Sequence, residues 1–226
     1  MTFSEVKSLL LSRVDRREYC DMYMEVNATT NYEELIWTTL SLFQWAWKTR
    51  IVDTGILDEI PDADLIAQGI YYNKTGAIIP APTKPYTYKG RYEIWVIGGD
   101  PTISLGELTK VNCYSTQATI TSVNNAYLDI TVYDSEITVT STDNSIVNIS
   151  LRNNGAEEAT LSIQDDSKMF IEILTLTVIN LNRTVNGIGI LNAYDNSVAN
   201  IIFSEDKNVL HSNAYQNAQI NYNFTP

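Results

Sequence analysis

The chain has 226 residues, 44% of them hydrophobic, which is enough for the core of one large or two small domains and excludes general disorder. Its formal net charge of -12, from 15 basic and 27 acidic residues, argues against nucleic-acid binding and against docking on an anionic membrane. Cys20 and Cys113 are too few for a disulfide framework or a zinc motif, and no apolar run reaches the roughly 18 residues of a membrane-spanning helix.

Residues 1–72 are predicted to be helical. Thr2 and Glu5 have the spacing of a capping box, and apolar residues then recur on one face of the helix that follows. A second helix is expected to start at Thr30 or Asn31, because acidic residues fill its first turn, where the helix dipole favours them.

This segment carries much aromatic surface for its size. The residues concerned are Trp37, Phe43, Trp45 and Trp47. They either form a compact helical core or anchor the chain to another protein, since aromatic residues dominate interface energetics.

Residues 73–111 are predicted to be a connector that contains strands. Pro80, Pro82 and Pro85 favour a stiff, extended stretch, and the tyrosine-rich strands that follow predict a hairpin turning at Lys89-Gly90.

Residues 112–226 contain a degenerate repeat: an Asn or Asp, then a very small residue, then up to three apolar residues at alternate positions. The residues that begin each copy are Asn125, Asp134, Asn144, Asp166, Asn196 and Asn217. Asn and Asp tolerate the left-handed backbone of a tight corner, and alternating apolar residues form a strand with one buried face. Longer gaps around residues 165–186 and 196–217 predict loops or an irregular coil there.

A repeated corner and strand predicts a short parallel β-solenoid. The expected fold class is therefore α+β, with an N-terminal helical segment (1–72), a Pro-rich connector with a β-hairpin (73–111) and a β-solenoid (112–226).

The residues do not favour an enzyme or a cofactor. His211 is the only histidine, which excludes a histidine-based triad or a multi-histidine metal site. A pair of carboxylates could hydrolyse glycosidic bonds, with Asp129 and Asp165 as the candidates. Asp134 and Asp166, however, occupy the corner position, where Asn and Asp interchange as a turn role predicts. We expect no catalytic residue and no metal.

Tyrosines surrounded by Asn, Ser and Thr are better candidates for binding. Tyr133, Tyr194 and Tyr215 could hold sugars or proteins with their flat rings, or could stack on one another along the solenoid wall.

The run Ala193-Tyr194-Asp195-Asn196-Ser197-Val198, with related runs at Tyr133-Asp134-Ser135 and Thr142-Asp143-Asn144-Ser145, resembles repeats in virion proteins of tailed bacteriophages, crAss-like gut phages in particular. The resemblance covers residues 112–226 and is compositional. It implies a fibre or appendage subunit of the virion, commonly a homotrimer, assembled in the host cytoplasm. Its N-terminal region would bind other virion proteins, and its β-rod would project toward a host-surface glycan or protein. No residue role is carried over.

Two alternatives remain. A tail-spike enzyme that degrades polysaccharides would place carboxylates on one outward face, away from the corners. A bacterial surface adhesin would carry an export signal, and the first residues lack the basic start and apolar run that such a signal has.

Overall fold

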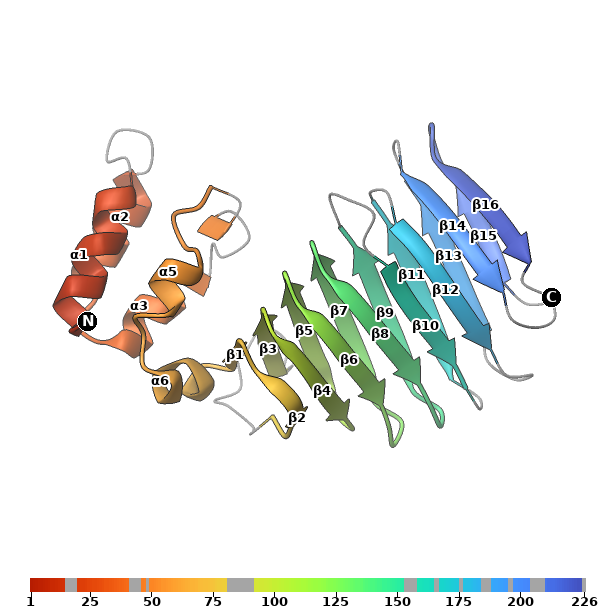
Figure 1. The fold of residues 1–226 in the computed structure, drawn as a ribbon, viewed down its shortest axis with the longest axis horizontal. Helices are drawn as coiled ribbons and strands as arrows, with labels where there is room; N and C mark the ends of the chain where they lie inside the picture. Colours follow the sequence, from red (N-terminus) through yellow and green to blue (C-terminus); the bar gives the residue numbers. More distant parts are fainter. Residues whose placement is uncertain are drawn as a thin grey trace. The chain divides into compact units, whose positions relative to one another are not determined.

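The protein consists of N-terminal helices followed by a parallel β-solenoid, which confirms the predicted fold class (Figure 1). The chain divides into two compact units, Met1–Tyr72 and Asn73–Pro226, and each is described by itself. The computed structural model describes residues 1–14, 20–40, 46–47, 49–80, 92–152, 158–164, 167–174, 177–183, 188–194, 197–203 and 210–224.

The helical unit is built from short helices and ends in a short strand. In chain order these elements are α1 (Phe3–Arg13), α2 (Cys20–Ala28), α3 (Tyr32–Leu40), α5 (Thr54–Leu57), α6 (Asp62–Ala67) and β1 (Ile70–Tyr72). The sequence pattern did not predict α2, in which the buried positions Met22 and Val26 are the one clear sign of a helical period. A small apolar cavity of about 20 Å³ lies in the core of this unit, between residues of α1, α3, α5 and α6.

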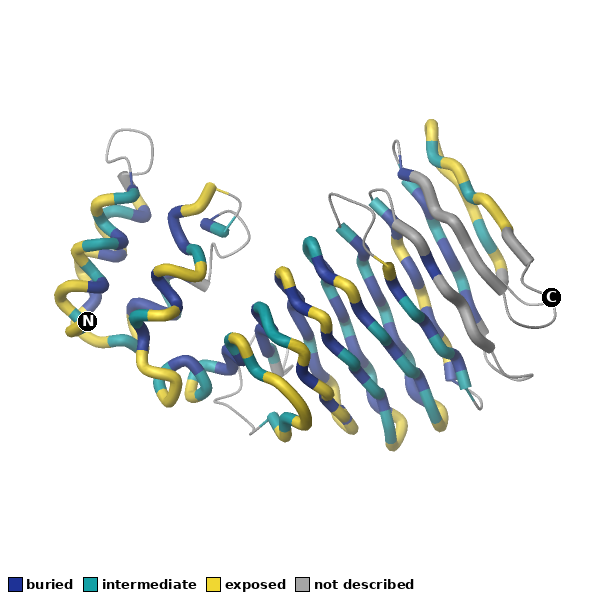
Figure 2. The backbone as a smooth tube through the Cα atoms, in the orientation of Figure 1, coloured by how far each residue is buried: buried dark blue, intermediate teal, exposed yellow. Residues whose placement is uncertain are grey.

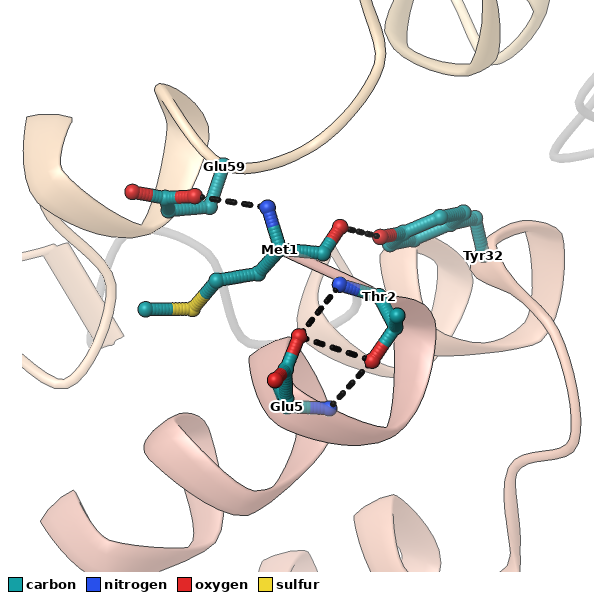
Figure 3. Close-up of polar contacts among 5 residues, drawn as sticks. All are labelled: Met1, Thr2, Glu5, Tyr32 and Glu59. Atoms are coloured by element: carbon teal, nitrogen blue, oxygen red, sulfur yellow. Dashed lines mark hydrogen bonds and ion pairs between the residues drawn. The ribbon is translucent and has the colours of Figure 1, made fainter.

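Two of its helices begin as the sequence predicts. The Thr2 hydroxyl accepts a hydrogen bond from the Glu5 N–H, and the Glu5 carboxylate accepts one from the Thr2 N–H at 2.7 Å, which is a complete capping box (Figure 3). At α3, Asn31 Oδ1 accepts a hydrogen bond from the Glu34 N–H at 2.9 Å. Each cap satisfies backbone donors that the first turn of a helix leaves unpaired.

The chain's first residue is also held within this unit. The Met1 amino group forms an ion pair with Glu59 at 2.9 Å, and the Tyr32 hydroxyl donates to the Met1 carbonyl at 3.4 Å (Figure 3). The ion pair is largely exposed, so its contribution to stability is small.

The solenoid alternates short strands and tight corners. Its first strands are β2 (Thr75–Ile78), β3 (Tyr92–Ile97), β4 (Asp100–Leu105), β5 (Thr109–Tyr114), β6 (Gln117–Ser122), β7 (Tyr127–Tyr133), β8 (Glu136–Ser141) and β9 (Ile146–Leu151). The later strands are β10 (Glu158–Ile163), β11 (Lys168–Ile173), β12 (Thr177–Arg183), β13 (Ile188–Ala193), β14 (Val198–Phe203), β15 (Leu210–Ala214) and β16 (Gln219–Phe224).

Each coil of the solenoid contributes one strand to each of two parallel sheets. One sheet runs through β3, β5, β7, β9, β11, β13 and β15, and the other through β2, β4, β6, β8, β10, β12, β14 and β16. Every strand pairs with the strand two positions on, as β6 with β8 and β7 with β9. The register keeps equivalent residues of successive coils side by side, so each position in a strand forms a column.

The columns that face inward form the core. Val132, Leu151, Ile173 and Ala193 are neighbours in one such column, and all are fully buried. Burial alternates with exposure along the central strands, as Figure 2 shows. The interior positions predicted for the copies at Asn125, Asp134 and Asn144 are confirmed, from Leu128 at 0% exposure onward.

The corners are built largely as the repeat predicts. Asn125 and Asp134 adopt left-handed backbone, with φ of 62° and 46°. Two other corners shift that role by one residue, to Asp143 (φ 54°) in front of Asn144 and to Gln216 (φ 58°) in front of Asn217. The repeat predicts left-handed backbone at Asn144 and Asn217, and the structure places it one residue earlier. The type of turn decides which of two polar corner residues adopts this backbone.

The small residue that follows the corner points inward in most copies of the repeat, although Ala218 is only half-buried. Ala126, Ser145 and Ser167 are at most 2% exposed, so a larger side chain has no room between neighbouring coils. Several of the buried serines are satisfied internally: the Ser122 and Ser145 hydroxyls are 2.7 Å apart, and the Ser167 hydroxyl donates to the Ser141 carbonyl at 2.9 Å. Within the described residues, the buried Ser197 hydroxyl has no such partner.

Three regions differ from the expectations. β11 and β14 lie where the repeat copies predict strands, whereas β12 and β15 occupy the gaps in 165–186 and 196–217 that were predicted to be irregular; all four belong to the same parallel sheets. In the segment 73–111, β2 pairs with β4 and β3 pairs with β5, in parallel. The described part of the predicted connector therefore belongs to the solenoid, and the predicted turn at Lys89-Gly90 lies outside the described residues.

Candidate functional site: the two outer faces of the solenoid

The outward positions of the sheet from β3 to β15, here called the odd face, are linked by side-chain hydrogen bonds. Glu93 forms an ion pair with Lys110 and accepts a hydrogen bond from Asn112 Nδ2 at 2.9 Å. Asn148 Nδ2 donates to Asp129 Oδ1 at 2.7 Å. These residues lie in two adjacent columns of the register, so their hydrogen bonds connect successive coils across the odd face.

Tyrosines stack at the edge of the odd face, where its strands end. Tyr114 and Tyr133 lie with ring centroids 4.7 Å apart and planes 10° apart, and the Arg152 guanidinium lies over the Tyr133 ring at 5.8 Å. Tyr194 and Tyr215 repeat this arrangement at 5.0 Å and 9°. Partial burial raises the pKa of the Tyr133 hydroxyl, which therefore remains a neutral donor at physiological pH.

Stacking bears directly on the three tyrosines predicted to bind a ligand. In Tyr133 and Tyr194 at least one ring face is covered by a neighbouring tyrosine, while Tyr215 is 45% exposed. A ligand at these residues would meet ring edges, hydroxyls and the outer side of Tyr215.

The outward positions of the other sheet, from β2 to β16, are here called the even face. Its first strands carry hydroxyl residues in two columns, which we call the hydroxyl array. The array consists of Thr102, Thr119, Thr138 and Thr160 in one column and Ser104, Thr121, Thr140 and Ser162 in the other. The four residues of the array in β6 and β8 are half-buried, and Thr102 and Ser104, in β4, are exposed. The sequence does contain the signal, as Thr-Ile-Thr at 119–121 and Thr-Val-Thr at 138–140, although the repeat pattern alone did not single it out.

Two carboxylates of the repeat region, Asp129 and Asp143, have structural partners. Asp129 accepts from Asn148, and Asp143 Oδ2 accepts from the Asn124 N–H at 2.8 Å across adjacent corners. Within the described ranges, no group of three or more His, Cys, Asp or Glu side chains is placed to hold a metal ion. Asp165, the other candidate for glycoside hydrolysis, lies outside the described residues.

The predicted anchor residues fall in the helical unit. Trp37, in α3, and Trp47 are half-buried, so each shows part of its ring to solvent while the rest packs within the unit. Phe43 and Trp45, and the corner residues Asp166 and Asn196, lie outside the described residues.

No protein-family model matches this chain, and no curated protein or solved structure is significantly similar to it. Among the described residues, none of the helices is both long and apolar enough to cross a membrane. Any function must therefore be inferred from the two outer faces of the solenoid.

Proposed function

We propose that this chain is a non-enzymatic structural component of a bacteriophage particle, a subunit of a head or tail fibre or appendage. The observation that carries the proposal is the continuous column structure of the solenoid, in which each coil supports the next through parallel pairing and a buried apolar stack. Such a stack is stiff and extends by adding coils, which suits a structural subunit. The resemblance of its corner runs to phage virion repeats supports the same assignment.

In this proposal the two units have different tasks. The helical unit, with its half-exposed Trp37 and Trp47, binds other virion proteins, because partly buried aromatic residues are effective interface anchors. The solenoid associates with itself as a homotrimer and offers its outer faces to a glycan or protein on the host surface. Its acidic composition favours solubility of the free subunit.

The alternative is a tail-spike enzyme that cleaves polysaccharide. The structural role of Asp129, which accepts a hydrogen bond from Asn148 within the odd face, favours the non-enzymatic proposal. A general acid or nucleophile needs a second carboxylate at a suitable distance, and Asp134 and Asp143 serve in corners instead.

The proposal can be tested by examining phage particles purified from a host that produces this chain. We expect the chain at a fixed copy number in gradient-purified particles, with antibodies against residues 112–226 labelling one site on each particle. Absence from intact particles, with the chain found only in the soluble lysate, would contradict a virion role.

An assay for the release of reducing sugar from capsular polysaccharides distinguishes the enzyme alternative from the structural proposal. We expect no activity from the full chain. Activity lost in Asp129→Asn and retained in the neighbouring outward variant Thr131→Ala would replace the structural proposal by the enzymatic one.

A further inference from the structure

The hydroxyl array differs from the odd face in that its threonines are gathered in two adjacent columns. Among the described residues, the hydroxyls of Thr119, Thr121 and Thr138 form no hydrogen bond to the protein, and the same holds for Thr102, Thr140 and Thr160. On the odd face the outward residues Asn112 and Asn148 instead donate to neighbouring side chains. Ser162 accepts a hydrogen bond from Gln164 Nε2, and the threonine hydroxyls of the array are directed to whatever lies outside it.

The array is also periodic in two directions. Along the solenoid, neighbouring rows are separated by the spacing of parallel strands, about 4.8 Å. Along each strand, the two columns are two residues apart, roughly 6.6 Å. The register is maintained without a slip from β4 through β6 and β8 to β10.

The side chains of the array are held in place from below. The residue between the two columns in each strand is a buried aliphatic residue at 0% exposure, namely Ile103, Ile120, Val139 and Leu161. Threonine is stiff at χ1 because it is β-branched, so each threonine of a column has few rotamers in which to present its methyl and hydroxyl groups.

A partner for such a surface must itself be periodic, uncharged and able both to donate and to accept hydrogen bonds. The two columns contain no charged residue, and Gln117, Glu136 and Glu158 border the array along one side. The prism face of hexagonal ice is neutral and repeats its water oxygens at two spacings close to those of the array. Water molecules held by the hydroxyls in these rows would therefore occupy positions that continue into the ice lattice.

We propose that the hydroxyl array of the even face is an ice-binding surface. The threonine hydroxyls hold a first layer of water in lattice positions, and the methyl groups fill the spaces between those waters. The inference rests on register, exposure and chemistry of residues 102–162 and does not depend on a role in a phage particle.

The test is thermal hysteresis of the full chain, the gap between the freezing and melting temperatures of an ice crystal in its solution. We expect a measurable gap and faceted crystals for the wild-type chain, and loss of most of the gap in Thr138→Tyr, whose ring stands above the centre of the array. The matched control is Thr131→Tyr, an outward, half-buried threonine of the odd face, which should retain the wild-type gap.

Thr138→Val serves as a second variant, because valine keeps the shape of threonine and removes only the hydroxyl. It should fold, as judged by circular dichroism, and reduce the gap. An equal freezing and melting temperature for the wild-type chain, with round unfaceted crystals, would overturn the proposal. So would a folded Thr138→Tyr chain with an undiminished gap, or equal losses in Thr131→Tyr and Thr138→Tyr.

Discussion

At the residue scale, the corners show how single polar side chains maintain the register of the coils. Asp143 combines a left-handed backbone with a carboxylate that accepts a hydrogen bond from the Asn124 N–H of the preceding coil. Asn and Asp are the non-glycine residues that best tolerate this backbone, and their short side chains reach adjacent backbone donors. The Asn/Asp repeat in the sequence therefore reflects both a conformational and a hydrogen-bonding requirement.

Asp143→Ala should reduce the free energy of unfolding by about 1–2 kcal/mol, since it removes one hydrogen bond. It also places at positive φ an alanine, whose side chain cannot hydrogen-bond to the local backbone as that of Asp or Asn does. Urea unfolding monitored by circular dichroism measures the change. Asp143→Asn keeps the conformational tolerance and an acceptor oxygen, so it should be close to wild type. An equal loss in both variants would show that the corner role assigned to this side chain is wrong.

Cys113 provides a second prediction at this scale. It lies in an inward column of β5 and is completely buried, and burial raises the pKa of its thiol to about 12. Because only the thiolate reacts, a Cys20→Ser variant should resist alkylation at pH 8 in the folded state and react fully in denaturant. Mass spectrometry after iodoacetamide treatment measures this, and rapid labelling of the folded variant would contradict the inward placement of Cys113.

The sequence predicts the corners better than their details. An Asn or Asp followed by a very small residue identifies where the chain turns, because both requirements are local. Whether Asp143 or Asn144 takes the left-handed backbone depends on the turn type and on the hydrogen bond to the neighbouring coil, which no local pattern contains.

At the element scale, the solenoid is stabilised by columns of aliphatic residues that each strand shares with its two neighbours. Ile149 pairs with Ile130 on one side and Ile171 on the other, and all three are at most 2% exposed. A cavity at this position cannot be filled by rearrangement of one strand, since both neighbours are fixed by backbone pairing.

Ile149→Ala should therefore reduce the free energy of unfolding by about 2–5 kcal/mol. Ile146→Ala, in the same strand but at a half-buried position, is the control and should cost less than about 1.5 kcal/mol. Denaturant titrations of the two variants side by side check the difference, and equal losses would be inconsistent with the inward column.

Prediction of the elements succeeded where corner and alternation occur together, as in 125–151, and failed where only one of them is present. Strands β12 and β15 are not preceded by an Asn or Asp followed by a very small residue, so the sequence predicts irregular structure at 177–183 and 210–214. The alternation of apolar residues in these strands indicates a buried face only once their pairing with strands of neighbouring coils is known. The outward columns were missed for the same reason, because Thr119 and Thr138 are neighbours only when the coil length is known.

At the scale of the whole molecule, the chain divides into a helical unit and a solenoid, to which the structural proposal assigns attachment and presentation of a surface. In a solenoid most contacts are between neighbouring coils, so its stability is close to a sum over coils and their interfaces. The homotrimer in the structural proposal comes from the resemblance to phage virion proteins, in which such rods are commonly trimeric.

The most direct test of this account is the solution mass of the full chain, measured by light scattering after size-exclusion chromatography. The account predicts a mass three times the 25.4 kDa of one chain, independent of concentration over the range measured. A mass equal to that of one chain at every concentration would contradict it.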